Sequence, residues 1–151
     1  YLSSAASDVY KRQAPPDLAA RKPELHFHAE LGDEPDPAWA DDIDQVVFRG
    51  SLAMEEVVFF HRASSTAIVG DLVQRHAPMR GWKGLLMRLD GLVGEAGSTP
   101  REWRASFLRR RPARSARSRL LAWKPDQLLI AHGACAREDA TAILTRALAW
   151  M

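Results

Sequence analysis

The chain has 151 residues, a formal net charge of +2, 46% hydrophobic residues and 26% charged residues. This composition is typical of one globular domain and excludes a disordered or fibrous protein. The single cysteine, Cys135, excludes an internal disulfide framework and a cysteine-rich zinc site. No apolar run approaches the roughly 18 residues of a membrane span, and no secretion-signal pattern is present. We therefore expect a cytoplasmic protein that makes no membrane contact.

Charge is distributed unevenly along the chain. Residues 1–75 have a net charge of −6 and residues 76–151 a net charge of +8, and Arg101 to Arg119 contains eight arginines and one acid. This basic region is either a binding surface for an anionic partner or the solvated face of a helix. The second interpretation is favoured, and nucleic acid is not expected, because no aromatic platform accompanies the arginines. The candidate anion-binding residues are Arg109, Arg110 and Arg111.

The N-terminal part combines polar and proline-rich segments. Residues 1–13 have no convincing period, and we expect a loose tail outside the native sequence. A short helix is predicted to end before Pro23. Residues 25–31 alternate between apolar and polar side chains, which predicts a half-buried strand. His26 and His28 would then share one face, as a metal pair or, as we favour, as two solvent-facing side chains.

The middle of the chain predicts strands. Trp39 is expected to anchor a turn-rich loop, and QVVFRG follows it as a strand. Residues 56–61 and 66–69 are rich in β-branched and aromatic side chains and predict a hairpin. Because Val57 to Phe60 is apolar without alternation, we expect both faces of the first hairpin strand to be covered.

Helical periods follow Asp71. Residues 82–93 predict an amphipathic helix, and Thr99 is expected to cap a second one. A third helix is predicted from Pro112 to near Trp123, then a buried strand over QLLIAHG and a final helix over 138–150. The residues expected to face inward are Trp82, Leu85, Leu86, Leu89, Val93, Trp103, Phe107, Ala113, Ala116, Leu120, Trp123, Ala140, Ile143, Leu144, Ala147 and Leu148.

Two polar residues directly follow apolar strands. Asp71 comes after the second hairpin strand and His132 after the last strand. Strand ends are places where ligands and metals bind, and both side chains are ordinary zinc ligands. The alternatives are that Asp71 caps a turn and that His132 is structural. Glu55 and Glu56 cannot share a proton, because adjacent strand residues point to opposite faces, and Cys135 has no identifiable base.

Between Pro23 and Trp150 the chain resembles the C-terminal half of the metallo-β-lactamase-like fold, closest to an uncharacterised branch of that superfamily. The resemblance rests on WADDIDQVVFRGS, EEVVFFHRASSTAIVGDL and LLAWKPDQLLIAHG. It implies an α/β fold, a partial αββα sandwich with one sheet, a hairpin and helices, truncated at the N-terminus. Residues 14–151 would form this half-domain. Many members of the superfamily are zinc- or iron-dependent hydrolases.

The resemblance also implies a metal site. Asp71 falls at the position of the superfamily's bridging aspartate ligand, and His132 at that of its last histidine ligand. The main ligand motif, His-x-His-x-Asp-His, is absent, and Gly50-Ser51 stands where a middle histidine is usual. A catalytic zinc normally needs three protein ligands. We therefore expect zinc or another divalent metal only in a full-length protein and none in this chain.

The resulting hypothesis is a hydrolase-like fragment with a reduced metal site, inactive as this chain, whose small-molecule substrate is unknown. Ser51 and His61 are candidate neighbours of the site, although a hairpin-end histidine such as His61 is more often solvent-exposed. The alternative is a non-catalytic module that binds an anionic partner through Arg101–Arg119. A fragment with no independent function is a third reading, and it predicts self-association through an exposed sheet.

Overall fold

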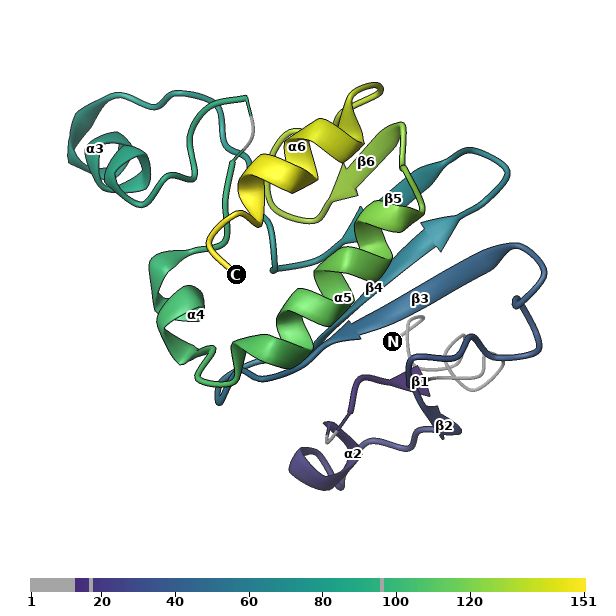
Figure 1. Ribbon diagram of the computed structural model, residues 1–151. Helices are drawn as coiled ribbons and strands as arrows, with labels where there is room; N and C mark the ends of the chain where they lie inside the picture. The colour runs from purple at the N-terminus through teal and green to yellow at the C-terminus, as the bar shows by residue number, and fades with distance from the viewer. Residues whose placement is uncertain (1–12, 17, 96) are drawn as a thin grey trace, which may run out of the picture.

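The computed structural model describes residues 13–16, 18–95 and 97–151 (Figure 1). The expectation for residues 1–12 lies outside this range, and Gln13 lies in a short strand. The elements are β1 (Gln13–Ala14), α2 (Leu18–Arg21), β2 (Ala29–Glu30), β3 (Ile43–Phe48), β4 (Glu56–His61), β5 (Thr66–Val69), α3 (Gly81–Leu89), α4 (Arg101–Ser106), α5 (Arg110–Ala122), β6 (Gln127–Ile130) and α6 (Ala140–Ala147).

The main sheet has the order β3-β4-β5-β6, and β1 and β2 form a separate two-stranded parallel sheet. The predicted hairpin is present as β4 and β5, with the predicted bounds. β3 and β5 both pair antiparallel with β4, whereas β6 pairs parallel with β5. Parallel neighbours need a long crossover, and the segment containing α3, α4 and α5 provides it.

Two helices cover one face of this sheet. α5 lies across the sheet and α6 lies beside it near β6 (Figure 1). The predicted inward positions of α5, Ala113, Ala116 and Leu120, are buried, as is Leu144 of α6. They pack with alternate residues of the strands into one hydrophobic core. The strand residues in this core are Val46, Phe48, Val58, Ala67, Val69, Leu128 and Ile130.

The opposite face of the sheet is open over β4, β5 and β6. Ile68 is 37% exposed and Leu129 48% exposed, and both line a shallow apolar groove with Phe59. The expectation that both faces of β4 are covered is therefore wrong for the described residues, because both helices pack on the same side. At β3 a loop covers this face, since the Gln45 side-chain amide donates to the carbonyls of Gly32 and Glu34.

The N-terminal segment differs from its prediction. The alternating strand expected over residues 25–31 is reduced to the two residues of β2, and His26 and His28 lie before it. Both histidines are exposed, with ring centroids 5.4 Å apart. Among residues 13–16, 18–95 and 97–151, β2 pairs only with the two-residue β1, which gives too few backbone hydrogen bonds to extend it.

Two expectations about the helices are corrected. The Thr99 side chain does not cap α4, because it is buried and accepts a hydrogen bond from the Trp150 indole (2.9 Å). Asp90 instead accepts the first backbone N–H of α4, that of Arg101 (2.9 Å). The apolar stripe of α3 faces solvent, and α3 projects away from the sheet (Figure 1). No helix among the described residues is long and apolar enough to cross a membrane.

Candidate functional site

The candidate site lies at one end of the strands of the main sheet, an end that is called this edge below. The register pairs the end of β3 with the start of β4, Phe48 with Glu56, and the end of β5 with the end of β6, Val69 with Ile130. Since β5 also pairs antiparallel with β4, its end lies beside the start of β4. The residues that follow β5, those that precede β4 and those that follow β6 therefore lie together at this edge.

Asp71 and His132 meet at this edge. Each follows its strand by two residues, so the parallel register of β5 and β6 places them side by side. His132 Nε2 lies 2.8 Å from Asp71 Oδ1, and each side chain is about half exposed. The contact is an ion pair when the imidazole is protonated and a hydrogen bond from Nε2–H when it is neutral. The structure thus unites two residues that are 61 positions apart in the sequence.

Glu56 fixes the backbone on which Asp71 stands. Its carboxylate accepts three backbone N–H groups, from Gly70 (2.8 Å), Asp71 (2.7 Å) and Leu72 (2.6 Å). Burial raises the pKa of Glu56, while the three backbone hydrogen bonds oppose that rise. Sequence reasoning considered Glu56 only as half of a carboxylate pair with Glu55 and so missed this role. The sequence did contain a signal for this role. In a hairpin, a glutamate at the start of the first strand lies opposite the Gly-Asp turn that follows the second strand.

The backbone after His132 is held just as closely. Gly133 has a φ of 124°, a conformation that favours glycine. A Cβ at Gly133 would overlap the Arg75 backbone, including its carbonyl oxygen. The Arg75 N–H donates to the His132 carbonyl (3.1 Å), and the Ala134 N–H donates to the Arg75 carbonyl (2.6 Å). The position of His132 therefore depends on this approach of two backbone segments.

The structure places the two predicted neighbours of the site differently. Ser51 lies in the loop before β4, where its hydroxyl bonds the Ser106 hydroxyl (2.6 Å) and accepts two backbone N–H groups of that loop. His61 lies at the other end of β4 from Glu56, so it does not join Asp71 and His132. Its Nδ1 lies 2.7 Å from the Ser64 hydroxyl at the hairpin turn, where it is partly exposed.

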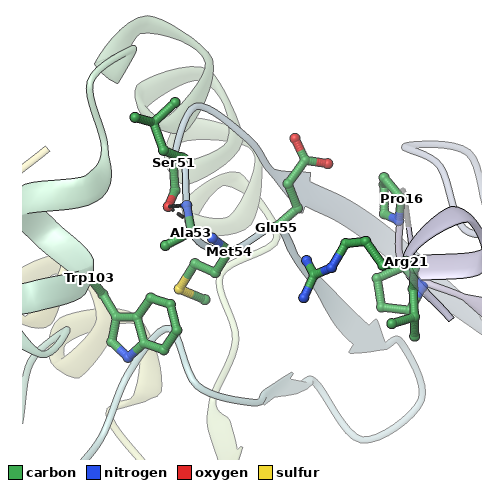
Figure 2. A pocket seen from close by; sticks show the side chains of 10 residues that line it. Pro16, Arg21, Ser51, Ala53, Met54, Glu55 and Trp103 are labelled. Carbon is green, nitrogen blue, oxygen red and sulfur yellow. Dashed lines mark hydrogen bonds between the residues drawn. The ribbon is translucent and has the colours of Figure 1, made fainter.

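A pocket of about 430 Å³ lies beside the loop that contains Ser51 (Figure 2). Its lining includes Met54, Glu55 and Trp103 on one side and Arg21 on the other, and Figure 2 shows the Arg21 guanidinium reaching toward the loop. The volume lies within the range of small-molecule sites. Neither Asp71 nor His132 lines it. The pocket therefore has apolar and charged walls and does not include the candidate pair Asp71 and His132.

The fold of this chain resembles that of a solved metallo-β-lactamase structure. No protein-family model and no curated protein matches the sequence. A crystal structure of the DIM-1 metallo-β-lactamase exposed to ceftazidime superimposes with a TM-score of 0.56 at 16% sequence identity. The match covers 97% of this chain and 60% of that one. The chain has a metallo-β-lactamase-like fold.

The described residues do not provide the donor set of a catalytic metal centre in this metallo-β-lactamase-like fold. Among them, no group of three or more His, Cys, Asp or Glu side chains is arranged to hold a metal ion. Asp71 and His132 supply two donors, and a catalytic zinc normally uses three protein ligands and an open position. His76 lies against Gln74, and Cys135 is an exposed free thiol. Asp71 and His132 alone could contribute only part of a coordination shell.

The basic region is used largely for structure. Within the described part of the chain, three arginines between Arg101 and Arg119 have no side-chain partner: Arg109, Arg111 and Arg114. Arg110, predicted to bind anions, lies over the Trp150 ring and donates to its carbonyl. Arg119 pairs with Asp33 of the acidic half. The opposite charges of the two halves are thus partly neutralised by one another.

Proposed function

We propose that this chain is part of a hydrolase-like protein whose metal site is reduced to Asp71 and His132, and that the chain alone does not hydrolyse a substrate. The observation that carries the proposal is the 2.8 Å contact between His132 Nε2 and Asp71 Oδ1 at the shared edge of β5 and β6. An imidazole nitrogen and a carboxylate oxygen are both common ligands of divalent metals. The structural match extends only to the fold, so activity and substrate belong to this proposal.

Several features support a site that has been retained and reduced, in preference to a chance surface pair. Glu56 accepts all three N–H groups of the turn that carries Asp71, and Gly133 permits the close backbone approach behind His132. Such support is typical of residues that must hold a fixed orientation. Two donors without a third hold a metal weakly and do not define an open position for water, which explains the expected lack of activity.

The test measures zinc affinity by isothermal titration. The exposed pair of His26 and His28 could bind zinc by itself, so all variants carry His26→Ala and His28→Ala. We expect the affinity to fall at least tenfold in Asp71→Ala and in His132→Ala, by analogy with the loss of a ligand at other sites. His61→Ala is the matched control, because His61 lies at the opposite edge of the sheet and should leave the affinity unchanged.

Two results would contradict the proposal. If the chain binds no zinc, iron or manganese, or binds them equally well without Asp71 and His132, these residues are not a metal site. If the zinc-loaded chain hydrolyses lactam or ester substrates faster than zinc alone, the site is not reduced. Activity is therefore assayed with each metal beside the binding measurement.

A second candidate function is a non-catalytic module that binds an anionic partner. The observation that favours it is the set of three exposed arginines without side-chain partners, Arg109, Arg111 and Arg114. Binding through them would weaken as salt concentration rises, because each contact releases counterions. Charge reversal at all three positions should abolish binding to heparin or a phosphorylated polymer. Retained binding in that variant would eliminate this candidate.

A further inference from the structure

The helix α3 turns its apolar stripe toward solvent. Trp82 is 69% exposed, Leu85 58%, Leu86 53% and Leu89 56%. The spacing of three and four residues places all four on one face of the helix. A helix that packs on its own domain normally buries such a stripe. The amphipathic period was predicted correctly, but within the described structure the stripe covers no core.

The inner side of α3 is formed by Gly84 and Met87. Gly84 is buried and Met87 is half-buried, whereas the stripe on the other side is exposed. The backbone of Met79, in the segment leading into the helix, lies so close to Gly84 that a Cβ there would overlap it. The helix therefore rests on its entry segment through Gly84, on the side opposite the leucines. Figure 1 shows α3 projecting from the rest of the molecule.

The exposed stripe is bordered by basic side chains. The helical period places Lys83 on one side of it and Arg88 on the other, with Arg80 at the N-terminal end. No acidic residue occurs from Leu72 to Leu89. The nearest acids in sequence are Asp90, which pairs with Arg101 (3.6 Å), and Glu95 in the following loop. Asp90 lines the hollow beside Leu86 and Leu89 but is paired with Arg101, so the surface around the stripe is apolar with an excess of positive charge.

We propose that α3 binds an anionic lipid surface, lying in the plane of the membrane interface with Trp82 and the three leucines inserted. Lys83 and Arg88 have long stems that can run beside the inserted residues and reach the headgroups. A tryptophan within such a stripe suits the same boundary, because its indole N–H can reach the polar layer. The expectation of no membrane contact rested on the lack of a spanning segment, and peripheral binding does not require one.

Lipid is favoured over a groove on another protein for two reasons. The shallow hollow that Leu86 and Leu89 line with Leu92 and Arg101 does not include Trp82 or Leu85, whereas an apolar layer below charged headgroups can take up all four side chains together. Positive side chains lie on both flanks, which matches a uniformly negative surface on either side of the helix.

The test is sedimentation of the 151-residue chain with phosphatidylcholine vesicles that contain no phosphatidylserine or about one third phosphatidylserine. We expect the partition coefficient to be at least tenfold higher on the anionic vesicles at low salt. The double variant Leu85→Glu/Leu89→Glu should lower it at least tenfold. Leu108→Glu is the matched control, because Leu108 is 69% exposed but lies outside α3, and it should bind as the unmodified chain does.

A charge variant keeps the test decisive if the leucine variant does not fold. Lys83→Glu/Arg88→Glu retains the apolar stripe and should remove the preference for anionic vesicles; circular dichroism checks that both variants are folded. Equal binding to neutral and anionic vesicles, or full binding by the folded leucine variant, would overturn the proposal. The proposal would also fail if the unmodified chain is a dimer that does not bind vesicles and the leucine variant is a monomer. In that case α3 would be a contact between two copies of the chain.

Discussion

Glu56 is one residue whose side chain organises the candidate site without being part of the pair itself. Its half-buried carboxylate satisfies three backbone N–H groups of the turn after β5. A glutamine would turn N–H groups of its own toward some of these donors. We expect Glu56→Gln to lower the free energy of unfolding by about 1–3 kcal/mol, measured by urea denaturation. An unchanged stability would show that the turn is held by other contacts.

Gly133 tests the backbone on the other side of the pair. Its φ of 124° is unfavourable for any residue with a Cβ, and the Arg75 backbone occupies the space that the Cβ would need. We expect Gly133→Ala to lower the free energy of unfolding by about 1–3 kcal/mol or more, since about 1–3 kcal/mol is the usual cost of such backbone strain. Gly32→Ala is the control, because a Cβ at Gly32 meets no atom within 4 Å. Equal effects of the two substitutions would contradict this account.

Asp44 gives a pH dependence that can be worked out from its surroundings. Arg62 donates two hydrogen bonds to its carboxylate, at 2.8 and 2.6 Å. These bonds, more than the opposing partial burial, hold the pKa of Asp44 below its ordinary value of 3.8. A carboxyl whose pKa is lower in the folded state contributes stability above its unfolded pKa and loses that contribution as pH falls through the folded pKa.

The corresponding prediction compares the unmodified chain with Asp44→Asn. The unmodified chain should be more stable by about 0.2–1 kcal/mol above pH 4, as is usual for an ion pair near the surface. This difference should disappear as the pH falls below the lowered pKa of Asp44. Thermal unfolding between pH 3 and 7 measures it. A difference that does not change with pH would mean that Asp44 acts by packing and not by its charge.

At the scale of an element, α5 shows how a strongly basic helix is held by a narrow apolar stripe. Ala113, Ala116 and Leu120 pack on the sheet, while its arginines lie on the other sides. Leu120→Ala removes the largest of these buried side chains and should cost about 2–5 kcal/mol. Leu108→Ala, at an exposed position just before the helix, should stay within about 0.5 kcal/mol of the unmodified chain. Urea denaturation of both variants checks the contrast.

At the scale of the whole molecule, the described residues leave the second face of the main sheet open over β4, β5 and β6. The open groove over β4, β5 and β6 includes Phe59, Ile68 and Leu129. Exposed contiguous apolar surface favours association. We expect the chain to self-associate with rising concentration, and Ile68→Ser/Leu129→Ser to reduce this in sedimentation velocity. The helix variant Leu85→Glu/Leu89→Glu leaves this face intact and serves as the comparison; association lost only in that variant would place the contact on α3.

The sequence by itself determined the local elements that have a strong period. β-Branched and aromatic residues predicted the bounds of β4 and β5, and three- and four-residue spacing identified the buried positions of α5 and α6. These patterns are local, because each strand or helix carries its own apolar face. The positions of Asp71 and His132 after their strands could also be read directly from the chain, and their proximity then followed from a parallel pairing of two distant strands.

Only the tertiary structure decided which apolar faces are covered and what each polar group contacts. The same period that buries Leu120 leaves Leu85 exposed, because period identifies a stripe but not whether another element lies against it. The Thr99 hydroxyl was expected to cap a helix, but it accepts a hydrogen bond from the indole of Trp150, 51 residues away. The role of Glu56 likewise depends on strand register. Long-range packing and strand pairing bring these groups together. The energy of such contacts depends on residues far apart in the chain, so no short stretch of sequence predicts it.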